Sequence, residues 1–272
     1  MDAQVPLAAG TPVEVHGSRQ GARRSHLGLE TVFVLAICLG QSAVYSVLSL
    51  LDKLTAGPPL SHQTTSLNNS VTPDRPWLDL AHQLANNVFL AAAVPLALYL
   101  LMNVRRPGSN PWRAIGLDGR RTRRDALTGV GITAAIGVPG LGLYLLARAI
   151  GVNTTIAAGN LASQWWTVPM YVFAAFANGM LEEVVMIGYL LTRWRQCGWH
   201  PGAAIAVSAL IRGSYHLYQG FGGFAGNLVM GLAFGWYWQR TRRLWPLVIA
   251  HTLLDVFSFV GYSLLKNVVS WL

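Results

Sequence analysis

The chain has 272 residues, of which 53% are hydrophobic and only 11% are charged. Because a soluble globular domain carries about a quarter charged residues, this composition excludes an ordinary soluble protein and predicts a polytopic membrane protein. The net charge is +9, but the cations lie between the apolar runs, as membrane orientation signals do, so we expect no nucleic-acid partner. Cys38 and Cys197 lie in an apolar run and a short basic loop, which predicts neither a disulfide nor a thiolate metal site.

Three parts are predicted along the chain. Residues 1–27 are polar and lack the early apolar core of a signal peptide, so we expect a disordered cytoplasmic tail. Residues 28–265 are the transmembrane domain, and residues 266–272 are a short C-terminal tail. The expected fold class is all-α, a polytopic transmembrane bundle of about seven helices (six to eight) with a polar site inside the membrane. The seven apolar segments lie at about 28–52, 82–103, 126–150, 166–192, 201–219, 221–239 and 244–265.

The placement of arginine and lysine orients this bundle. With the N-terminus inside, the inner connections hold most of the cations, including RRPGSNPWR at 105–113 and GRRTRR at 119–124. The outer connections hold few: Lys53, Arg75, Arg148 and Lys266. This bias predicts an N-inside topology. The richness in Arg, Ala and Gly indicates a GC-rich bacterial genome, so we expect a bacterial plasma membrane. We expect the inner loop 104–125 to contact lipid headgroups, with substrate docking as the alternative.

Ionisable side chains are rare in membrane helices and are usually functional there. Here they gather on the fourth, fifth and seventh apolar segments, at similar depths for a rise of about 1.5 Å per residue. Residues four apart share a helix face, whereas the two adjacent glutamates point about 100° apart and should have different partners. The group consists of Glu182, Glu183, Arg212, His216, His251 and Asp255.

Two asparagines lie near this group. Asn178 is on the fourth apolar segment and Asn227 on the sixth. We interpret both as supporting residues that form helix–helix hydrogen bonds rather than as catalytic groups. Ser214 lies beside the group without the G-x-S-x-G context of a serine nucleophile, and we interpret it as a small packing residue.

Three stretches of the chain resemble, in order, the three motifs of the CAAX prenyl protease type II and bacteriocin-processing family (CPBP, or Abi), which are intramembrane endopeptidases. They are LEEVVMIGYLL, SALIRGSYHLYQG and LVIAHTLLDV. The family pattern is Glu-Glu-x-x-x-Arg, then Phe-x-x-x-His, then His-x-x-x-Asn or Asp. The resemblance covers about residues 80–260, with the motif core at 178–255.

The resemblance implies roles for the matching residues. Glu182, the first motif glutamate, would activate a water, and Glu183 is a further candidate catalytic residue. His216, His251 and Asp255 would hold a divalent metal ion, with zinc the expected cofactor and Glu182 a further possible ligand, or would act directly around the water and the tetrahedral intermediate. Two histidines and a carboxylate are suitable zinc ligands, but the sequence leaves both mechanisms open.

The motifs also depart from the family at two positions. Ile187 stands where the first motif has arginine, and Arg212 stands where the second has phenylalanine, whereas Gly188 is retained after the first motif. We therefore expect Arg212 to pair with Glu183, because an unpaired carboxylate at this depth would protonate or destabilise the fold.

The predicted function is an intramembrane endopeptidase that acts on peptides or on segments of membrane-associated proteins. The loss of the motif arginine supports an alternative, a non-catalytic scaffold, immunity or regulatory protein of the same fold. A proton-coupled transporter is a third possibility, because buried carboxylates and histidines also form proton relays. The chain lacks the inverted repeat and the paired broken helices that are typical of such transporters.

Overall fold

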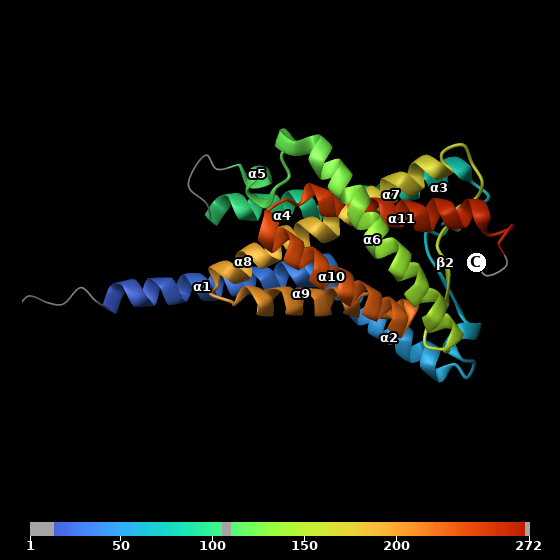
Figure 1. Cartoon of the computed structure of the whole chain (residues 1–272), viewed down its shortest axis with the longest axis horizontal. Helices are drawn as coiled ribbons and strands as arrows, with labels where there is room; N and C mark the ends of the chain where they lie inside the picture. The colour runs from blue at the N-terminus through green and yellow to red at the C-terminus, as the bar shows by residue number, and fades with distance from the viewer. Residues whose placement is uncertain (1–13, 105–109, 270–272) are drawn as a thin grey trace, which may run out of the picture.

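The computed structural model describes residues 14–104 and 110–269. Within them the chain is predominantly helical, with two short strands, which confirms the predicted all-α class. The helices run along the long axis of the molecule (Figure 1), and exposed arginines such as Arg24, Arg120 and Arg240 lie at one end, called here the basic end. The helices are α1 (Glu14–Leu35), α2 (Gln41–Thr55), α3 (Pro76–Ala91), α4 (Ala93–Val104), α5 (Pro111–Ile115), α6 (Thr122–Ala149), α7 (Thr167–Glu182), α8 (Leu190–Gln196), α9 (Pro201–Ser214), α10 (Phe221–Thr241) and α11 (Trp245–Leu265).

Five helical segments in the described residues are long and apolar enough to cross a membrane, so the chain is an integral membrane protein. Each coincides with one of the predicted apolar segments. The remaining two predicted segments are also helical, but α9 has only 14 residues and α10 is not among the five. The five segments are Arg24–Thr55, Pro76–Met102, Gly119–Ala149, Thr167–Gln196 and Trp245–Leu265.

The fourth segment is the centre of the bundle. In its most apolar stretch 78% of the residues are buried, against 11–28% in the other four segments. It joins α7 to α8 through a π-helical turn, η4 (Glu183–Tyr189). It packs against α3 and α11 along α7, and against α4 and α9 further on. The outer helices instead expose apolar side chains such as Ile37, Phe89 and Val138, as expected for surfaces that face lipid.

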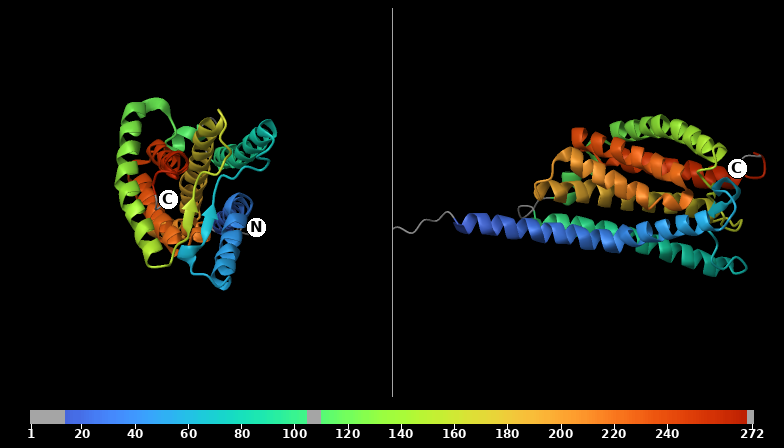
Figure 2. Two further views of the ribbon diagram at one scale, coloured as in Figure 1. Left: turned by 90° about the vertical axis from the view of Figure 1, so that its right-hand side faces the viewer. Right: turned by 90° about the horizontal axis from the view of Figure 1, so that it is seen from below.

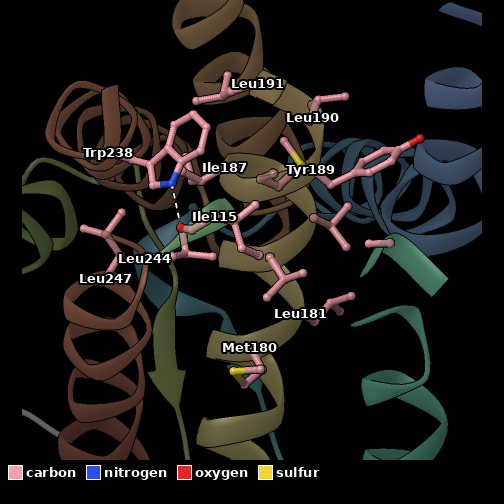
Figure 3. Close-up of a cluster of buried hydrophobic side chains, with 14 of the residues drawn as sticks. Ile115, Met180, Leu181, Ile187, Tyr189, Leu190, Leu191, Trp238, Leu244 and Leu247 are labelled. Atoms are coloured by element: carbon pink, nitrogen blue, oxygen red, sulfur yellow. Dashed lines mark hydrogen bonds between the residues drawn. The ribbon is translucent and has the colours of Figure 1, made fainter. Parts of the chain in front are cut away.

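The helices of the C-terminal half pack in a layer beside the central segment. α9 and α10 are antiparallel neighbours, and α6 crosses both α10 and α11, as the end-on view in Figure 2 shows. A buried apolar cluster joins these elements, and Figure 3 shows part of it. In it the indole of Trp238 on α10 donates a hydrogen bond of 3.0 Å to the carbonyl of Ile115 on α5.

At the opposite end two loops form a small parallel ladder. Strand β1 (Thr64–Ser66) pairs with strand β2 (Thr155–Ala157) in the register Thr65↔Ile156. A further bridge joins Asn153 to Gly220, the residue that follows the 3₁₀ turn η5 (Leu217–Gln219). This contact fixes the segment just after His216 against the loops.

The structure corrects one predicted boundary. The expected disordered tail covered residues 1–27, but α1 begins at Glu14. The helix continues into the apolar segment, where the side chain of Leu27 is buried, so the polar residues extend a helix that packing already supports. Residues 1–13 lie outside the described part of the chain. At the other end α11 finishes at Leu265, where the C-terminal tail is predicted to begin.

Candidate active site

The two adjacent glutamates lie where α7 changes into η4. Glu182 is the last residue of α7 and Glu183 the first of η4. A π-helical turn is rare and occurs frequently at functional sites, because its wider backbone alters the direction of the side chains. The sequence predicts a kink or tilt of this segment from Pro169 and Gly179, but it does not predict this turn.

Arg212, on α9, lies between the two glutamates. Its Nη1 donates to Oε2 of Glu183 at 3.4 Å and its Nη2 donates to Oε1 of the same carboxylate. Nη2 also lies 3.1 Å from Oε2 of Glu182. The predicted pairing of Arg212 with Glu183 is therefore confirmed, whereas the expectation that the two glutamates have separate partners is only partly correct. Both carboxylates share this guanidinium, because its planar fork presents several N–H groups in different directions.

Glu182 has a second partner that was not predicted from the sequence. The hydroxyl of Tyr215 donates to Oε2 of Glu182 at 2.6 Å. Tyr215 follows Arg212 by three residues at the end of α9, a spacing that places both side chains on one face of the helix. That spacing is the signal that would have identified it.

The two histidines are held through their Nδ1 atoms. Nδ1 of His216 lies 2.9 Å from the carbonyl oxygen of Arg212 and therefore donates to it. Nδ1 of His251 lies 2.8 Å from Oε1 of Glu183 and 3.0 Å from Nη2 of Arg212. We assign the Nδ1–H tautomer to His251 as well, because a carboxylate accepts and the shorter contact is to Glu183. In both residues Nε2 is then the nitrogen left for chemistry.

Asp255 lies at the open side of this group. Its carboxylate oxygen Oδ2 is 3.8 Å from Nε2 of His251 and accepts a 3.4 Å hydrogen bond from Nδ2 of Asn178. The bond joins α7 to α11, as the helix–helix interpretation of Asn178 predicts. Asn227 differs from that interpretation, because its Nδ2 donates to the carbonyl of Gly223 on its own helix. Its side chain satisfies the backbone of α10 and makes no bond to the site among the described residues.

Burial divides the site into a closed part and an accessible part. The side chains of Glu183 and Arg212 are 0% and 1% exposed, whereas those of Glu182 and Asp255 are 12% and 22% exposed. An Arg–Glu pair buried this completely is stable only when its hydrogen bonds are well satisfied. Both terminal nitrogens of Arg212 are bonded, whereas its buried Nε has no partner among the described residues. The closed part fixes the geometry of the site, and the accessible carboxylates are the ones that water or a substrate can reach.

The expected zinc site can be compared with these positions. In the part of the chain that the structure describes, no three His, Cys, Asp or Glu side chains are arranged so that they could hold a metal ion. The guanidinium of Arg212 also lies within hydrogen-bonding distance of both Glu182 and His251, which brings a fixed positive charge among the predicted ligands. The residues as placed do not fit a metal ion, and zinc remains a prediction from the motifs.

The remaining motif residues lie apart from the site chemistry. Ile187 is buried in the apolar cluster near Trp238 (Figure 3). Ser214 donates from Oγ to the carbonyl of Ile211 at 2.7 Å, which suits the predicted packing role and leaves no sign of an activated nucleophile. The position that carries arginine in the family therefore contributes to the core here, and the cation comes from α9.

Comparison with known proteins identifies the same region of the chain. Residues 164–257 match the family model described as type II CAAX prenyl endopeptidase Rce1-like. The matched segment contains α7, η4, α9 and the first half of α11, and hence every side chain of the site. No significant match was found among curated proteins or among solved structures. The match supports the resemblance inferred from the motifs: residues 164–257 are similar to the family of type II CAAX prenyl endopeptidases.

Proposed function

We propose that the protein is an intramembrane endopeptidase that hydrolyses peptide bonds of peptides or membrane-associated proteins with a water activated by Glu182. One observation carries the proposal: the two oxygens of Glu182 are not equivalent. Oε2 accepts hydrogen bonds from Tyr215 and Arg212, whereas Oε1 accepts none from the described residues. A carboxylate held by one oxygen and free at the other is suited to accept a proton from a bound water.

The chemistry follows from this arrangement. Glu182 takes a proton from the water while the water oxygen attacks the carbonyl carbon of the scissile bond. The π electrons of the carbonyl move to its oxygen, and a tetrahedral oxyanion forms. When the oxyanion collapses, the C–N bond breaks and the leaving nitrogen receives the proton that Glu182 accepted. The products are a carboxylic acid and an amine, and Glu182 returns to its ionised form, so no further reactant is needed.

The histidines suit supporting roles in both steps. Because each is held at Nδ1, each presents Nε2 from a fixed ring orientation. A protonated Nε2 of His251 would donate to the oxyanion, and the carboxylate of Asp255 lies 3.8 Å from that nitrogen. Nε2 of His216 would accept a hydrogen bond from the water or relay the proton of Glu182 to the leaving nitrogen. Glu183 would act indirectly, by holding both Arg212 and His251 in place.

The orientation in the membrane is part of the same proposal. Most of the exposed arginines gather at the basic end, which also carries the start of α1, and a positive end faces the cytoplasm in most membrane proteins. We place this end on the cytoplasmic side of a bacterial plasma membrane. A Thr241→Cys variant in a Cys38→Ser, Cys197→Ser background should react with an impermeant thiol reagent in inverted vesicles and not in right-side-out vesicles. The reverse labelling pattern would show that the basic end faces the outside.

The function is tested with purified protein in liposomes and two quenched-fluorescence probes, a prenylated CAAX peptide and an unlipidated hydrophobic transmembrane peptide. Wild type, Glu182→Gln and Glu30→Gln are compared. Glu30 is a matched control, because it is a carboxylate on α1 that bonds Tyr189 and Arg193 rather than the site. We expect hydrolysis of at least one probe by wild type and Glu30→Gln, with loss in Glu182→Gln.

The outcomes separate the candidate functions. Hydrolysis that survives Glu182→Gln would exclude the assigned base. Failure of the wild type on both probes, with the protein folded by thermal unfolding, would favour a non-catalytic scaffold or regulatory protein of the same fold. Mass spectrometry of the products identifies the cleaved bond and, with it, the substrate class.

A further inference from the structure

We propose that Tyr215 is the positioning residue that selects which oxygen of Glu182 faces the water. This inference rests on the proposed function. The hydroxyl of Tyr215 would keep Oε2 occupied and so direct Oε1 toward the accessible side of the site. Neither the motif pattern nor the family match assigns a role to this residue.

Arg212 bonds both glutamates but not equally, so Glu182 needs a second hydrogen-bond donor. Its Nη2 atom reaches Glu183 and, at 3.1 Å, Glu182, whereas Nδ1 of His251, at 3.0 Å, carries a hydrogen and does not accept from it. A terminal guanidinium nitrogen carries only two N–H groups, so Nη2 can give each carboxylate one. Glu183 takes the shortest of these contacts and is also bonded by Nη1. Arg212 therefore holds Glu183 firmly and holds Glu182 only through one longer bond.

Tyr215 supplies the shorter bond to Glu182. The Oη to Oε2 distance of 2.6 Å is in the range of charge-assisted O–H···O⁻ bonds, which are about twice as strong as neutral ones. Both bonds go to Oε2, so together they hold this oxygen and fix the rotation of the carboxylate. Without the hydroxyl, the carboxylate could turn about its single remaining bond to Arg212, and either oxygen could face the site.

The tyrosine itself is held rigidly. It lies at the C-terminal end of α9, where its N–H bonds the carbonyl of Ile211, and its side chain is buried in the main apolar cluster. Its ring lies 4.8 Å from the imidazole of His216, measured between ring centroids. The side chain of Tyr215 thus contacts both the proposed base and the adjacent histidine, and it fixes their positions relative to each other.

A packing role is the competing explanation, because a buried tyrosine hydroxyl usually finds an acceptor. The chain offers a matched control in Tyr218, on the other side of His216. Its ring is 6.2 Å from the same imidazole, and its hydroxyl accepts from the side chain of Gln219 rather than contacting Glu182. Tyr215→Phe and Tyr218→Phe remove the same atom from the same segment, but only one of them touches the carboxylate.

The kinetic test compares these two variants with wild type in liposomes, on whichever of the two probes is cleaved. We expect Tyr215→Phe to lower kcat about ten- to a hundred-fold with KM unchanged, as for loss of a hydrogen bond to a charged group. Tyr218→Phe should stay close to wild type. Equal kcat values in the two variants, or a change confined to KM, would overturn the proposal. If Tyr215→Phe unfolds early, 3-fluorotyrosine at position 215 keeps the ring and should still change kcat, whereas 3-fluorotyrosine at position 218 should not.

An activity-independent measurement keeps this inference separate from the proposed function. Infrared difference spectra report the carboxylate stretch of Glu182 as the band that is lost in Glu182→Gln. Tyr215→Phe should shift this band, and the same change made in the Glu182→Gln background should produce no shift. If wild type cleaves neither probe but the band shifts, the contact stands and the enzymatic function fails. An unshifted band would refute the contact, whatever the activity.

Discussion

Glu183 and Arg212 form a bidentate ion pair between η4 and α9, and both side chains are buried. Both terminal nitrogens of the guanidinium reach the carboxylate, and His251 bonds the same Oε1 atom. Removing one partner of such a pair leaves an uncompensated charge in a medium where charge is costly. The pair therefore fixes the geometry around which the accessible residues are arranged.

We predict strong coupling between Glu183 and Arg212. Arg212→Met should lower the free energy of unfolding by about 3–5 kcal/mol, the range for breaking a buried pair. Glu183→Gln should also destabilise, and the double variant should lose clearly less than the sum of the two, by about 0.5–3 kcal/mol. Unfolding in mixed detergent micelles measures all four proteins. Additive losses would contradict the pair.

Glu182 provides the comparison for that cycle. It meets Arg212 through one contact of 3.1 Å and is partly exposed. The coupling of Glu182→Gln with Arg212→Met should therefore be smaller than that of Glu183→Gln. If the two couplings were equal, Arg212 would not distinguish the two glutamates.

A second prediction concerns the position where the family has arginine. Ile187 is 1% exposed within the apolar cluster, so Ile187→Arg should place an unpaired cation there and destabilise the fold by several kcal/mol. Arg212→Phe made in the same chain restores the family pattern at both positions, but it should not rescue stability, because the side chain of Ile187 packs in the apolar cluster that contains Trp238. Thermal unfolding in detergent tests both variants, with Ile187→Leu as a volume-conserving control. Recovery of wild-type stability in the double variant would show that position 187 can reach the site.

The sequence predicts the elements of this fold better than their rotations. Apolar length and charge placement are local properties, so they locate the helices, with α11 at Trp245–Leu265 against a predicted 244–265. The cost of burying charge likewise identifies Glu183, Arg212 and His251 from the sequence alone. Which residues meet depends on how each helix is turned about its axis. For this reason the hydroxyl of Tyr215, which is an ordinary membrane aromatic in sequence, was not predicted, and the bond of Asn227 was assigned to the wrong partner.

The third prediction concerns the metal. Because Arg212 already lies among the carboxylates and no three suitable donors converge in the described residues, we expect chelator-washed protein to keep its hydrolysis rate and its unfolding temperature. Elemental analysis of wild type and His251→Ala checks the expectation directly. Stoichiometric zinc that is lost in His251→Ala, together with activity that returns on adding zinc, would restore the metal mechanism expected from the family.

The last prediction is a dependence of stability on pH at the basic end. Arg243, between α10 and α11, forms ion pairs with Asp118 and with Asp125 at the start of α6. The hydrogen bond from Arg243 lowers the pKa of Asp118 below its ordinary value. A carboxyl whose pKa is lower in the folded state adds stability above its unfolded pKa and loses it as the pH falls through the folded pKa.

Stability should accordingly be level between about pH 7 and pH 5 and should fall below about pH 4, where aspartates begin to protonate. Asp118→Asn should be less stable at pH 7 and should lose less stability on acidification, because the titrating group is gone. Asp74→Asn makes the same chemical change at an exposed position in the loop before α3 and should leave the profile unchanged. Unfolding temperatures of the three proteins between pH 3 and pH 7 decide the matter, and parallel profiles for wild type and Asp118→Asn would show that the ion pair does not contribute to acid sensitivity.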